Sequence, residues 1–369
     1  MKRAALLIFV LLVAMPVPPE VTVDCDAGDD LARALRKAKR FPGTTIHVTG
    51  TCTGTFTVAA RNIRLRGDPS GSTVIEGPRD AIATRLTVLD VTVDSFIMSD
   101  ITVRNGWIGV HLRGGISTNS NVFINDSIFE DNYGGVLIDS GSFARVETST
   151  FRSNQVGVTV LFNSQGSIAD CDIRDSGILG IDVYDDSIAG VHGTSVSGSG
   201  DIGMAVSIGS FLGINEGTLT DNDGVHLLAQ DRSKLQLRNT AIGSGTDATQ
   251  LAMFVDDSSI LRSFRTVSWG DIFATGAVHL SNDDDAIHGS IFLEDFTQAN
   301  LSRTSVDGVI DCTSGSDAFC SGGVTASTTG CASAAAPCTS AAAQPSESAR
   351  ERPAVPASGG SALRERAKR

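Results

Sequence analysis

Three features are scarce in this sequence, and each scarcity excludes something. Among 369 residues there are two Trp and two Tyr, which excludes a long row of Trp or Tyr rings for stacking on a ligand. None of the seven cysteines forms a Cys-x-x-Cys motif or a Cys/His spacing typical of zinc sites. The only long apolar run, Ala4 to Met15, is too short to span a bilayer.

The apolar run follows a basic start, Met1-Lys2-Arg3, which is the pattern of a secretory signal peptide. We assign residues 1–19 to this signal and expect no transmembrane segment in the mature chain. The protein is therefore predicted to be secreted, periplasmic or at the cell surface. A retained N-terminal anchor is the alternative.

Positive charge is also in short supply, since the formal net charge is -13. Residues 1–20 carry +1 and residues 323–369 carry +3, which leaves -17 for residues 21–322. Such an acidic body argues against nucleic acid as a partner. An acidic glycan would need a local basic patch or bridging calcium, whereas a neutral glycan meets no such barrier. No cofactor motif is present, and calcium has no recognisable cage.

The sequence does contain a repeat with a period of 22 or 23 residues. A serine marks it at Ser120, Ser142, Ser164, Ser187, Ser210 and Ser233. Apolar residues follow at fixed offsets, first at Ile124, Val146, Ile168, Val191, Ile214 and Leu237, then at Phe129, Phe151, Ile173, Val196, Leu219 and Ile242. Self-similarity at this period is typical of a solenoid.

The apolar residues alternate with polar ones, as in Ile181-Asp182-Val183-Tyr184, which predicts short strands with one buried face. Three short strands and three turns fit a coil of this length. The fold class is therefore predicted as all-β, a single-stranded parallel β-helix solenoid. Two further columns fit it: a small inward column (Ser127, Ser149, Cys171, Thr194, Gly217, Thr240) and a turn column (Asn132, Asn154, Ser176, Ser199, Asn222).

The two ends of the chain differ from the repeat. Residues 29–40 (DDLARALRKAKR) predict an amphipathic helix within an N-terminal cap of residues 20–44 that covers the open end of the core. The β-helix is assigned to residues 45–322. Residues 323–369 are rich in Ala, Ser, Thr and Pro and are predicted to be a low-complexity disordered tail.

Export permits disulfide bonds, and the cysteines suggest three of them. Cys25 and Cys52 flank the predicted helix. Cys312 with Cys320, and Cys331 with Cys338, are spaced to close two small loops. Cys171 remains, and its place in the small inward column predicts a buried free thiol.

The coil pattern, with its turn Asn and its Gly-apolar-x-apolar strand (Gly135-Val136, Gly157-Val158, Gly180-Ile181, Gly203-Met204, Gly224-Val225), resembles the right-handed parallel β-helix family with the pectin-lyase-like fold. The resemblance covers roughly residues 21–320. It implies a groove on the strand face that follows each glycine. The predicted outward residues of that face are His111 and Arg113, Leu137 and Asp139, Thr159 and Leu161, Asp182 and Tyr184, Ala205 and Ser207, and His226 and Leu228.

Asn222-Asp223-Gly224 resembles the strand start of polygalacturonases, in which the Asp is an active-site acid. The double-Asp strand, Gly-His-Gly turn and basic triplet of that family have no counterpart in register downstream. Asp201 stands at a nearly equivalent point one coil earlier, so the two carboxyls are expected ~5–7 Å apart, within the range of a glycosidase pair. Ordinary turn acids are the alternative interpretation.

The predicted catalytic residues are Asp201, Asp223 and His226. Asp182 and Tyr184 are predicted to bind substrate, as are Asp139 and Arg113, which are also placed to form a surface ion pair. A polysaccharide or a cell-wall or surface component is the expected partner, with hydrolysis favoured over elimination if the protein is an enzyme. The alternative is a non-catalytic surface or extracellular β-helix of the adhesin type.

Overall fold

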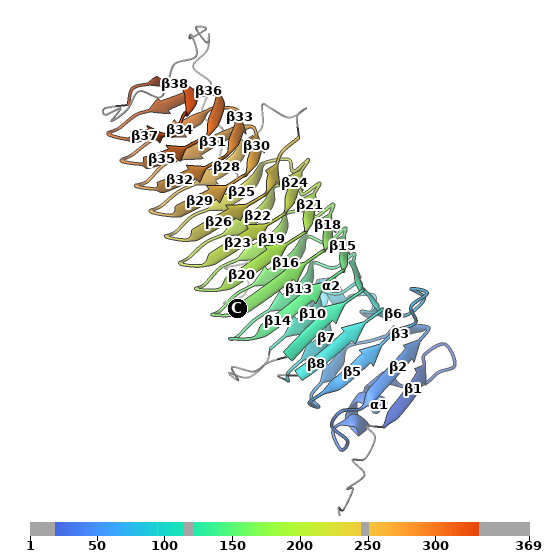
Figure 1. Cartoon of the computed structure of the whole chain (residues 1–369). Helices are drawn as coiled ribbons and strands as arrows, with labels where there is room; N and C mark the ends of the chain where they lie inside the picture. Colours follow the sequence, from blue (N-terminus) through green and yellow to red (C-terminus); the bar gives the residue numbers. More distant parts are fainter. Residues whose placement is uncertain (1–18, 94, 114–120, 245–250, 332–369) are drawn as a thin grey trace, which may run out of the picture.

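The computed structural model describes residues 19–93, 95–113, 121–244 and 251–331. These residues form a parallel β-solenoid whose coils stack along one axis (Figure 1). The predicted fold class is therefore confirmed. Ser120, Cys338, the predicted signal peptide up to residue 18 and the predicted tail from residue 332 lie outside the described residues.

Each regular coil contributes one strand to each of three faces, because the apolar residues alternate along short segments separated by turns. Face 1 is a continuous parallel sheet of 14 strands. Its strands are β1 (Glu20–Asp24), β2 (Thr45–Thr49), β5 (Ile63–Arg66), β8 (Ser95–Ser99), β11 (Asn121–Asn125), β14 (Phe143–Glu147), β17 (Gln165–Ala169), β20 (Ile188–His192), β23 (Phe211–Asn215), β26 (Lys234–Arg238), β29 (Ile260–Phe264), β32 (His279–Asp283), β35 (Gln298–Ser302) and β37 (Asp317–Ser321).

Face 2 consists mostly of very short strands. They are β3 (Thr51–Thr53), β6 (Val74–Glu76), β9 (Thr102–Arg104), β12 (Ile128–Glu130), β15 (Thr150–Arg152), β18 (Asp172–Arg174), β21 (Ser195–Ser197), β24 (Thr218–Thr220), β27 (Ala241–Ile242), β30 (Val267–Trp269) and β33 (Ala286–His288).

Face 3 carries the strands that follow the glycines. They are β4 (Phe56–Val58), β7 (Thr87–Val91), β10 (Ile108–Leu112), β13 (Gly134–Ile138), β16 (Val156–Val160), β19 (Leu179–Val183), β22 (Ile202–Val206), β25 (Val225–Ala229), β28 (Leu251–Val255), β31 (Asp271–Ala274) and β34 (Ile291–Leu293). In the last coils, β36 (Ser305–Cys312) and β38 (Thr325–Thr329) each continue from face 2 into face 3.

The core is a set of inward columns in which equivalent residues of successive coils touch. Val136, Val158 and Ile181 pair in register on face 3 and are buried. Phe129 and Phe151 stack with ring centroids 4.7 Å apart on face 2. Because each coil buries its apolar side only against its neighbours, stability is shared along the whole stack.

Polar columns at the turns are also buried, and hydrogen bonds between coils link several of their members. Asn154 Oδ1 accepts from the backbone N–H and the side-chain amide of Asn132, at 3.0 and 3.2 Å. Ser149 Oγ accepts from the backbone N–H of Ser127. These bonds confirm the predicted turn column and small column, and they fix the register in which coils stack.

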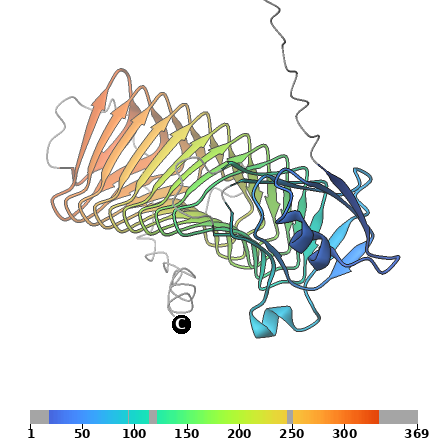
Figure 2. The same ribbon diagram turned by 90° about the horizontal axis from the view of Figure 1, so that it is seen from below.

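An amphipathic helix, α1 (Leu31–Ala38), covers the N-terminal end of the core (Figure 2). Asp30 caps it by accepting a 3.0 Å hydrogen bond from the Arg33 backbone N–H. Its buried residues are Leu31, Ala34, Leu35 and Ala38, the predicted apolar face. A second helix, α2 (Ala81–Thr84), was not predicted, because four residues are too few to show a periodic pattern.

The coils shorten towards the C-terminus. Hydrogen bonds between equivalent residues span 22 or 23 positions in the middle of the chain but 19 near the end. The fixed period of 22 or 23 residues thus holds only for the central coils. The strand β38 also extends the solenoid beyond residue 322, the predicted boundary.

Two disulfides join cysteines that lie one coil apart. The predicted Cys25–Cys52 bond is confirmed, with Cα atoms 5.2 Å apart. The second joins Cys312 to Cys331, so the predicted pairing of Cys312 with Cys320 is wrong, and so is that of Cys331 with Cys338. A separation of 19 residues equals one C-terminal coil and sets the two thiols side by side. Cys320 lies on β37 of face 1 and is also disulfide-bonded.

Cys171 is a buried free cysteine, as predicted, and we expect it to be unreactive in the folded protein. Burial raises the pKa of its thiol to about 11, so the reactive thiolate is nearly absent at pH 8. Iodoacetamide at pH 8 should modify Cys171 only after denaturation, as measured by intact mass. Rapid modification of the native protein would contradict this placement.

Candidate functional site

The outer side of face 3 carries columns of residues that point away from the core. One column, set by the pairing of successive strands, runs through Asp90, His111, Leu137, Thr159, Asp182, Ala205, Leu228, Phe254, Phe273 and Phe292. Two residues further along each strand or just beyond it lie Arg113, Asp139, Leu161, Tyr184 and Ser207. The predicted outward positions are therefore confirmed from His111 to Ser207.

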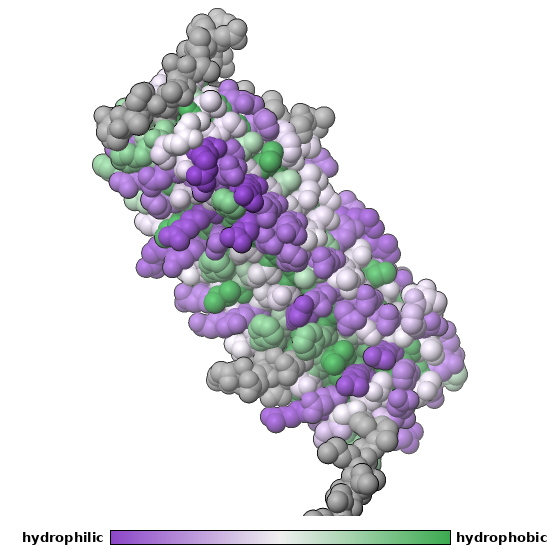
Figure 3. Space-filling model, in the orientation of Figure 1, coloured by the Kyte–Doolittle hydropathy of each residue, from purple (hydrophilic) through white to green (hydrophobic). Residues whose placement is uncertain are grey.

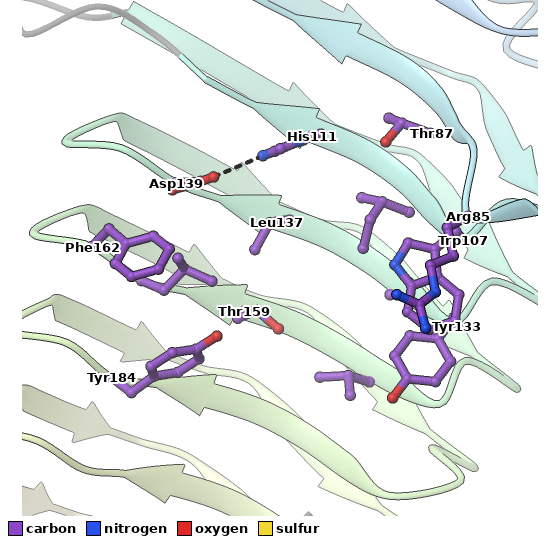
Figure 4. A pocket seen from close by; sticks show the side chains of 14 residues that line it. Arg85, Thr87, Trp107, His111, Tyr133, Leu137, Asp139, Thr159, Phe162 and Tyr184 are labelled. Carbon is purple, nitrogen blue, oxygen red and sulfur yellow. Dashed lines mark hydrogen bonds and ion pairs between the residues drawn. The ribbon is translucent and has the colours of Figure 1, made fainter. Parts of the chain in front are cut away.

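A pocket of ≈ 270 Å³ opens on this face over β10, β13 and β16 (Figure 4). Aromatic side chains stand at both ends of it. Trp107 and Tyr133 lie where the strands begin, and Phe162 and Tyr184 lie where strands end. Leu137 and Thr159 lie between the two ends, and His111 and Asp139 line one side.

The ring pair at the strand starts is built by stacking of coils. Gly134 donates a backbone hydrogen bond to the Trp107 carbonyl at 2.8 Å, which places Tyr133 one coil below Trp107. Their rings stack with centroids 3.8 Å apart and planes 9° apart. The Arg85 guanidinium lies 5.4 Å from the Trp107 centroid, within the range of a cation–π contact.

The sequence alone did not identify Tyr133 or Arg85 as pocket residues. Arg85 follows α2 in the left-handed conformation (φ 58°), which turns the chain at the pocket rim. A four-residue helix and one positive φ leave no pattern in the sequence. Tyr133 was detectable, since it stands directly before Gly134-Gly135, at the start of a predicted strand.

The polar part of the pocket is a pair formed by His111 and Asp139. His111 Nε2 lies 3.0 Å from Asp139 Oδ2, and the two side chains are 15% and 14% exposed. Burial works to raise the pKa of Asp139, but the hydrogen bonds from His111 and Ser140, together with the charge of His111, outweigh it and leave the pKa below its usual value. Asp139 is therefore ionised at neutral pH and holds the imidazole in place.

The predicted ion pair between Arg113 and Asp139 is wrong. The Arg113 guanidinium binds Asp90, one coil towards the N-terminus, with an Nε–Oδ1 distance of 2.9 Å. This hydrogen bond raises the pKa of Arg113. The sequence could have suggested Asp90, because it stands 23 residues before Arg113, a spacing close to one coil.

The two predicted sugar-binding residues of β19 and its flank lie on the correct face. Asp182 pairs in register with Thr159, and Tyr184 lines the pocket. Both side chains are nearly fully buried, at 3% and 4% exposed. Tyr184 thus stands with Phe162 at one aromatic end of the pocket, whereas Asp182 lies two residues earlier, within β19.

The predicted outward position of His226 is wrong. Strand pairing aligns Met204 with Leu227 and Ala205 with Leu228, so His226 occupies the position of Gly203. Its side chain is fully buried, and Nδ1 lies 3.0 Å from the Asn222 side-chain amide. The predicted repeat aligns Gly224 with Gly203. In the structure the backbone hydrogen bonds place Gly224 beside Asp201, which moves His226 two positions along the repeat.

Asp201 and Asp223 lie in adjacent coils but one residue out of register. The Gly224 N–H bonds to the Asp201 carbonyl, and the Asp223 N–H bonds to the Ser199 carbonyl. Burial raises the pKa of Asp201, while Asp223 is exposed. Neither residue lines the pocket.

Within the described ranges, no group of three or more His, Cys, Asp or Glu side chains is arranged to hold a metal ion. No helix in those ranges combines the length and apolar character required to cross a membrane.

Comparisons with known proteins agree on the architecture. Residues 89–259 match the family model for the right handed beta helix region. The solved structure of the mannuronan C-5 epimerase AlgE6 A-module of Azotobacter vinelandii is similar, with a TM-score of 0.50 and 15% identity over 82% of this chain and 89% of that one. Alginate lyase from Paenibacillus sp. str. FPU-7 gives a TM-score of 0.48 and 14% identity over 72% of this chain and 94% of that one.

No curated protein matches the chain significantly. At 15% identity the epimerase module bears on the fold alone. The family match and the strand topology show that the chain has the right-handed parallel β-helix, pectin-lyase-like fold.

The pair of His111 and Asp139 predicts a pH-dependent contribution to stability. Because the pKa of Asp139 is depressed in the folded state, its contribution is present above the usual Asp pKa of about 4 and is lost as pH falls through the folded value. Asp139→Asn should therefore lower the melting temperature at pH 7, and the difference from wild type should shrink below pH 4. A difference that stays constant from pH 7 to pH 3 would contradict this account.

Proposed function

We propose that this protein binds a polysaccharide chain on the outer side of face 3, with the pocket between Trp107 and Tyr184 as its sugar-binding site. The observation that carries the proposal is the combination, in one pocket, of a stacked ring pair with an ionised carboxylate and an imidazole. Sugar rings offer C–H faces that pack on aromatic rings, and hydroxyls that bond to carboxylates and imidazoles. Apolar walls with a few placed polar groups are typical of ligand sites.

The shape of face 3 suits a linear polymer. Equivalent outward positions recur at about 4.8 Å per coil, so a chain lying along the solenoid axis meets regularly spaced side chains across the coils that form the pocket. The mannuronan epimerase module has the same fold, so the fold is compatible with a polysaccharide substrate. The two disulfides favour an oxidising location, in line with the predicted export, and a cell-wall or surface glycan is an accessible partner there.

If the bound glycan is also cleaved, His111 is the residue best placed to move a proton. An imidazole gives and takes protons near neutral pH, and the ionised Asp139 orients it at the pocket wall. Arg85 at the pocket rim is the cation available to a uronate carboxylate, since Arg113 is held by Asp90. In this arrangement Asp139 is a positioning residue and His111 the candidate acid or base.

A second candidate chemistry is glycoside hydrolysis by Asp201 and Asp223. The raised pKa of Asp201 favours a protonated acid, and the exposed Asp223 provides a second carboxylate one coil away. This pair lies outside the pocket and would need a separate binding surface. The alternative to both chemistries is a non-catalytic, adhesin-like β-helix, in which the pocket binds a ligand without cleaving it.

Binding is tested by comparing Trp107→Ala with Trp269→Ala on a panel of neutral and acidic polysaccharides. Loss of the Trp107 ring removes half of the stacked pair and should weaken binding roughly tenfold, about 1.4 kcal/mol. Trp269 is the matched control, because it lies on face 2 and stacks on His288 away from the pocket. Isothermal titration calorimetry measures both. Equal affinity of the two variants, or wild-type binding to no polysaccharide, would overturn the pocket proposal.

Chemistry is tested by product release from the same panel, with and without calcium. His111→Ala should abolish any cleavage that takes place in the pocket while the melting curve shows that the fold is retained. Loss of new reducing ends in Asp223→Ala, with His111→Ala unaffected, would instead assign hydrolysis to the carboxylate pair. No product from a polymer that binds would assign the pocket to binding alone.

A further inference from the structure

An apolar stripe runs along the outside of face 3 from the edge of the pocket, where Val156 lines it, towards the C-terminus. Val156, Leu179, Ile202 and Val225 pair in register in one outward column. Ala205, Leu228 and Phe254 belong to the next column, and all seven residues form one contiguous cluster outside the core. Phe273 continues the stripe by stacking on Phe254 with centroids 5.4 Å apart, and Phe292 follows it. We call this surface, from Val156 to Phe292, the outer stripe.

The outer stripe is buried although it points away from the core. Ile202, Leu228 and Phe254 are 0%, 3% and 5% exposed. By contrast, His111 and Leu137, nearer the N-terminus in the column of Leu228, are partly exposed. Parallel sheets are normally covered on both faces, so a covering layer is expected here.

The described helices do not provide this layer. Helix α1 packs on β1 and β4 at the N-terminal end, and α2 lies at the same end of the solenoid (Figures 1 and 2). The visible surface is mostly hydrophilic with separate hydrophobic patches (Figure 3). The burial of an apolar stripe that crosses seven coils on the outer side of the sheet therefore calls for a covering segment.

The described chain ends where the outer stripe ends. The last strand, β38, aligns Thr329 with Asp311, and Asp311 aligns with Phe292 at the end of the stripe. The bond between Cys312 and Cys331 fixes this exit point. Residues 332–369 follow. Even as a helix they would reach about 57 Å, whereas the six coil steps from β34 to β16 span about 29 Å.

The composition of residues 332–369 complements face 3. Residues 332–346 carry no charge and consist mainly of Ala, Ser, Thr and Pro, which can lie close against aromatic rings. Residues 347–369 carry six bases and three acids. Among the described outward residues of face 3 from β16 onward there are acids and no base, the acids including Asp182, Asp256, Glu294 and Asp311.

We propose that residues 332–369 fold back over face 3 of their own chain and cover the outer stripe. The uncharged part lies on the Phe254–Phe292 rings next to the exit point, and the basic part reaches the acids of more N-terminal coils. A segment of the same chain is favoured over a second copy, because tethering gives it an effective concentration in the millimolar range. The proposal does not depend on glycan binding by the pocket.

Photo-crosslinking in the full chain tests this proposal. A benzophenone amino acid replaces Phe254 in the outer stripe or, as a control, Phe264 in the same coil on face 1. The probe at position 254 should form crosslinks within one molecule, and peptide mass spectrometry should place them in residues 332–369. The probe at position 264 should give at least severalfold fewer. Crosslinks from position 254 to a second molecule, to another protein, or only to residues before 332 would overturn the proposal.

A second full-length variant guards against a perturbing probe. Residues 339–369 are replaced by Gly and Ser of equal number, which leaves Cys338 and every described residue unchanged. Uncovering the stripe should raise the fluorescence of a hydrophobic dye severalfold, while circular dichroism shows that the β-solenoid is intact. Dye fluorescence equal to that of the wild type would overturn the proposal.

Discussion

Hydrogen bonding between residues one coil apart is the interaction on which the rest of this molecule depends. The described strands pair in parallel with their equivalents in neighbouring coils, and several buried Asn, Ser and Thr residues of the turns bond to the same neighbours. A slip of one residue would turn inward side chains outward and leave these buried polar groups without partners. Register is therefore enforced twice, by the apolar columns and by the polar ladders at the corners.

This constraint explains how much of the fold the sequence reveals. A repeat that must hold register shows itself as fixed spacing, so the central coils, the small column, the Asn column and the amphipathic helix α1 were all predictable. The shorter C-terminal coils were not, because a change of period looks like a loss of pattern. The bond between Cys312 and Cys331 was missed for the same reason. Its separation of 19 residues is one coil only if the coils are known to be shorter there, whereas the predicted pairs were chosen because their cysteines are close in sequence.

The site was only partly predictable, and the differences are again matters of register. Alternation along a strand placed His111, Asp139 and Tyr184 on the outer side of face 3. The prediction aligned Gly224 with Gly203, two positions away from its structural equivalent Asp201, and therefore placed His226 on the outer side. In the structure His226 is buried beside Asn222. The contacts of Arg113 with Asp90 and of Trp107 with Tyr133 could be predicted only by knowing which side chains of neighbouring coils lie side by side. Arg85 is itself the single left-handed residue that follows a four-residue helix, and no periodicity in the sequence indicates its position.

The placement of α1 has a consequence for the molecule as a whole. A stack of identical coils has no intrinsic limit to its length, and its end strands present unpaired N–H and C=O groups to any similar surface. Helix α1 closes the N-terminal end with Leu31 and Leu35 against the interior and charged residues towards solvent. The same short segment that completes the core thus replaces an apolar end surface, on which a second solenoid could stack, with a charged one.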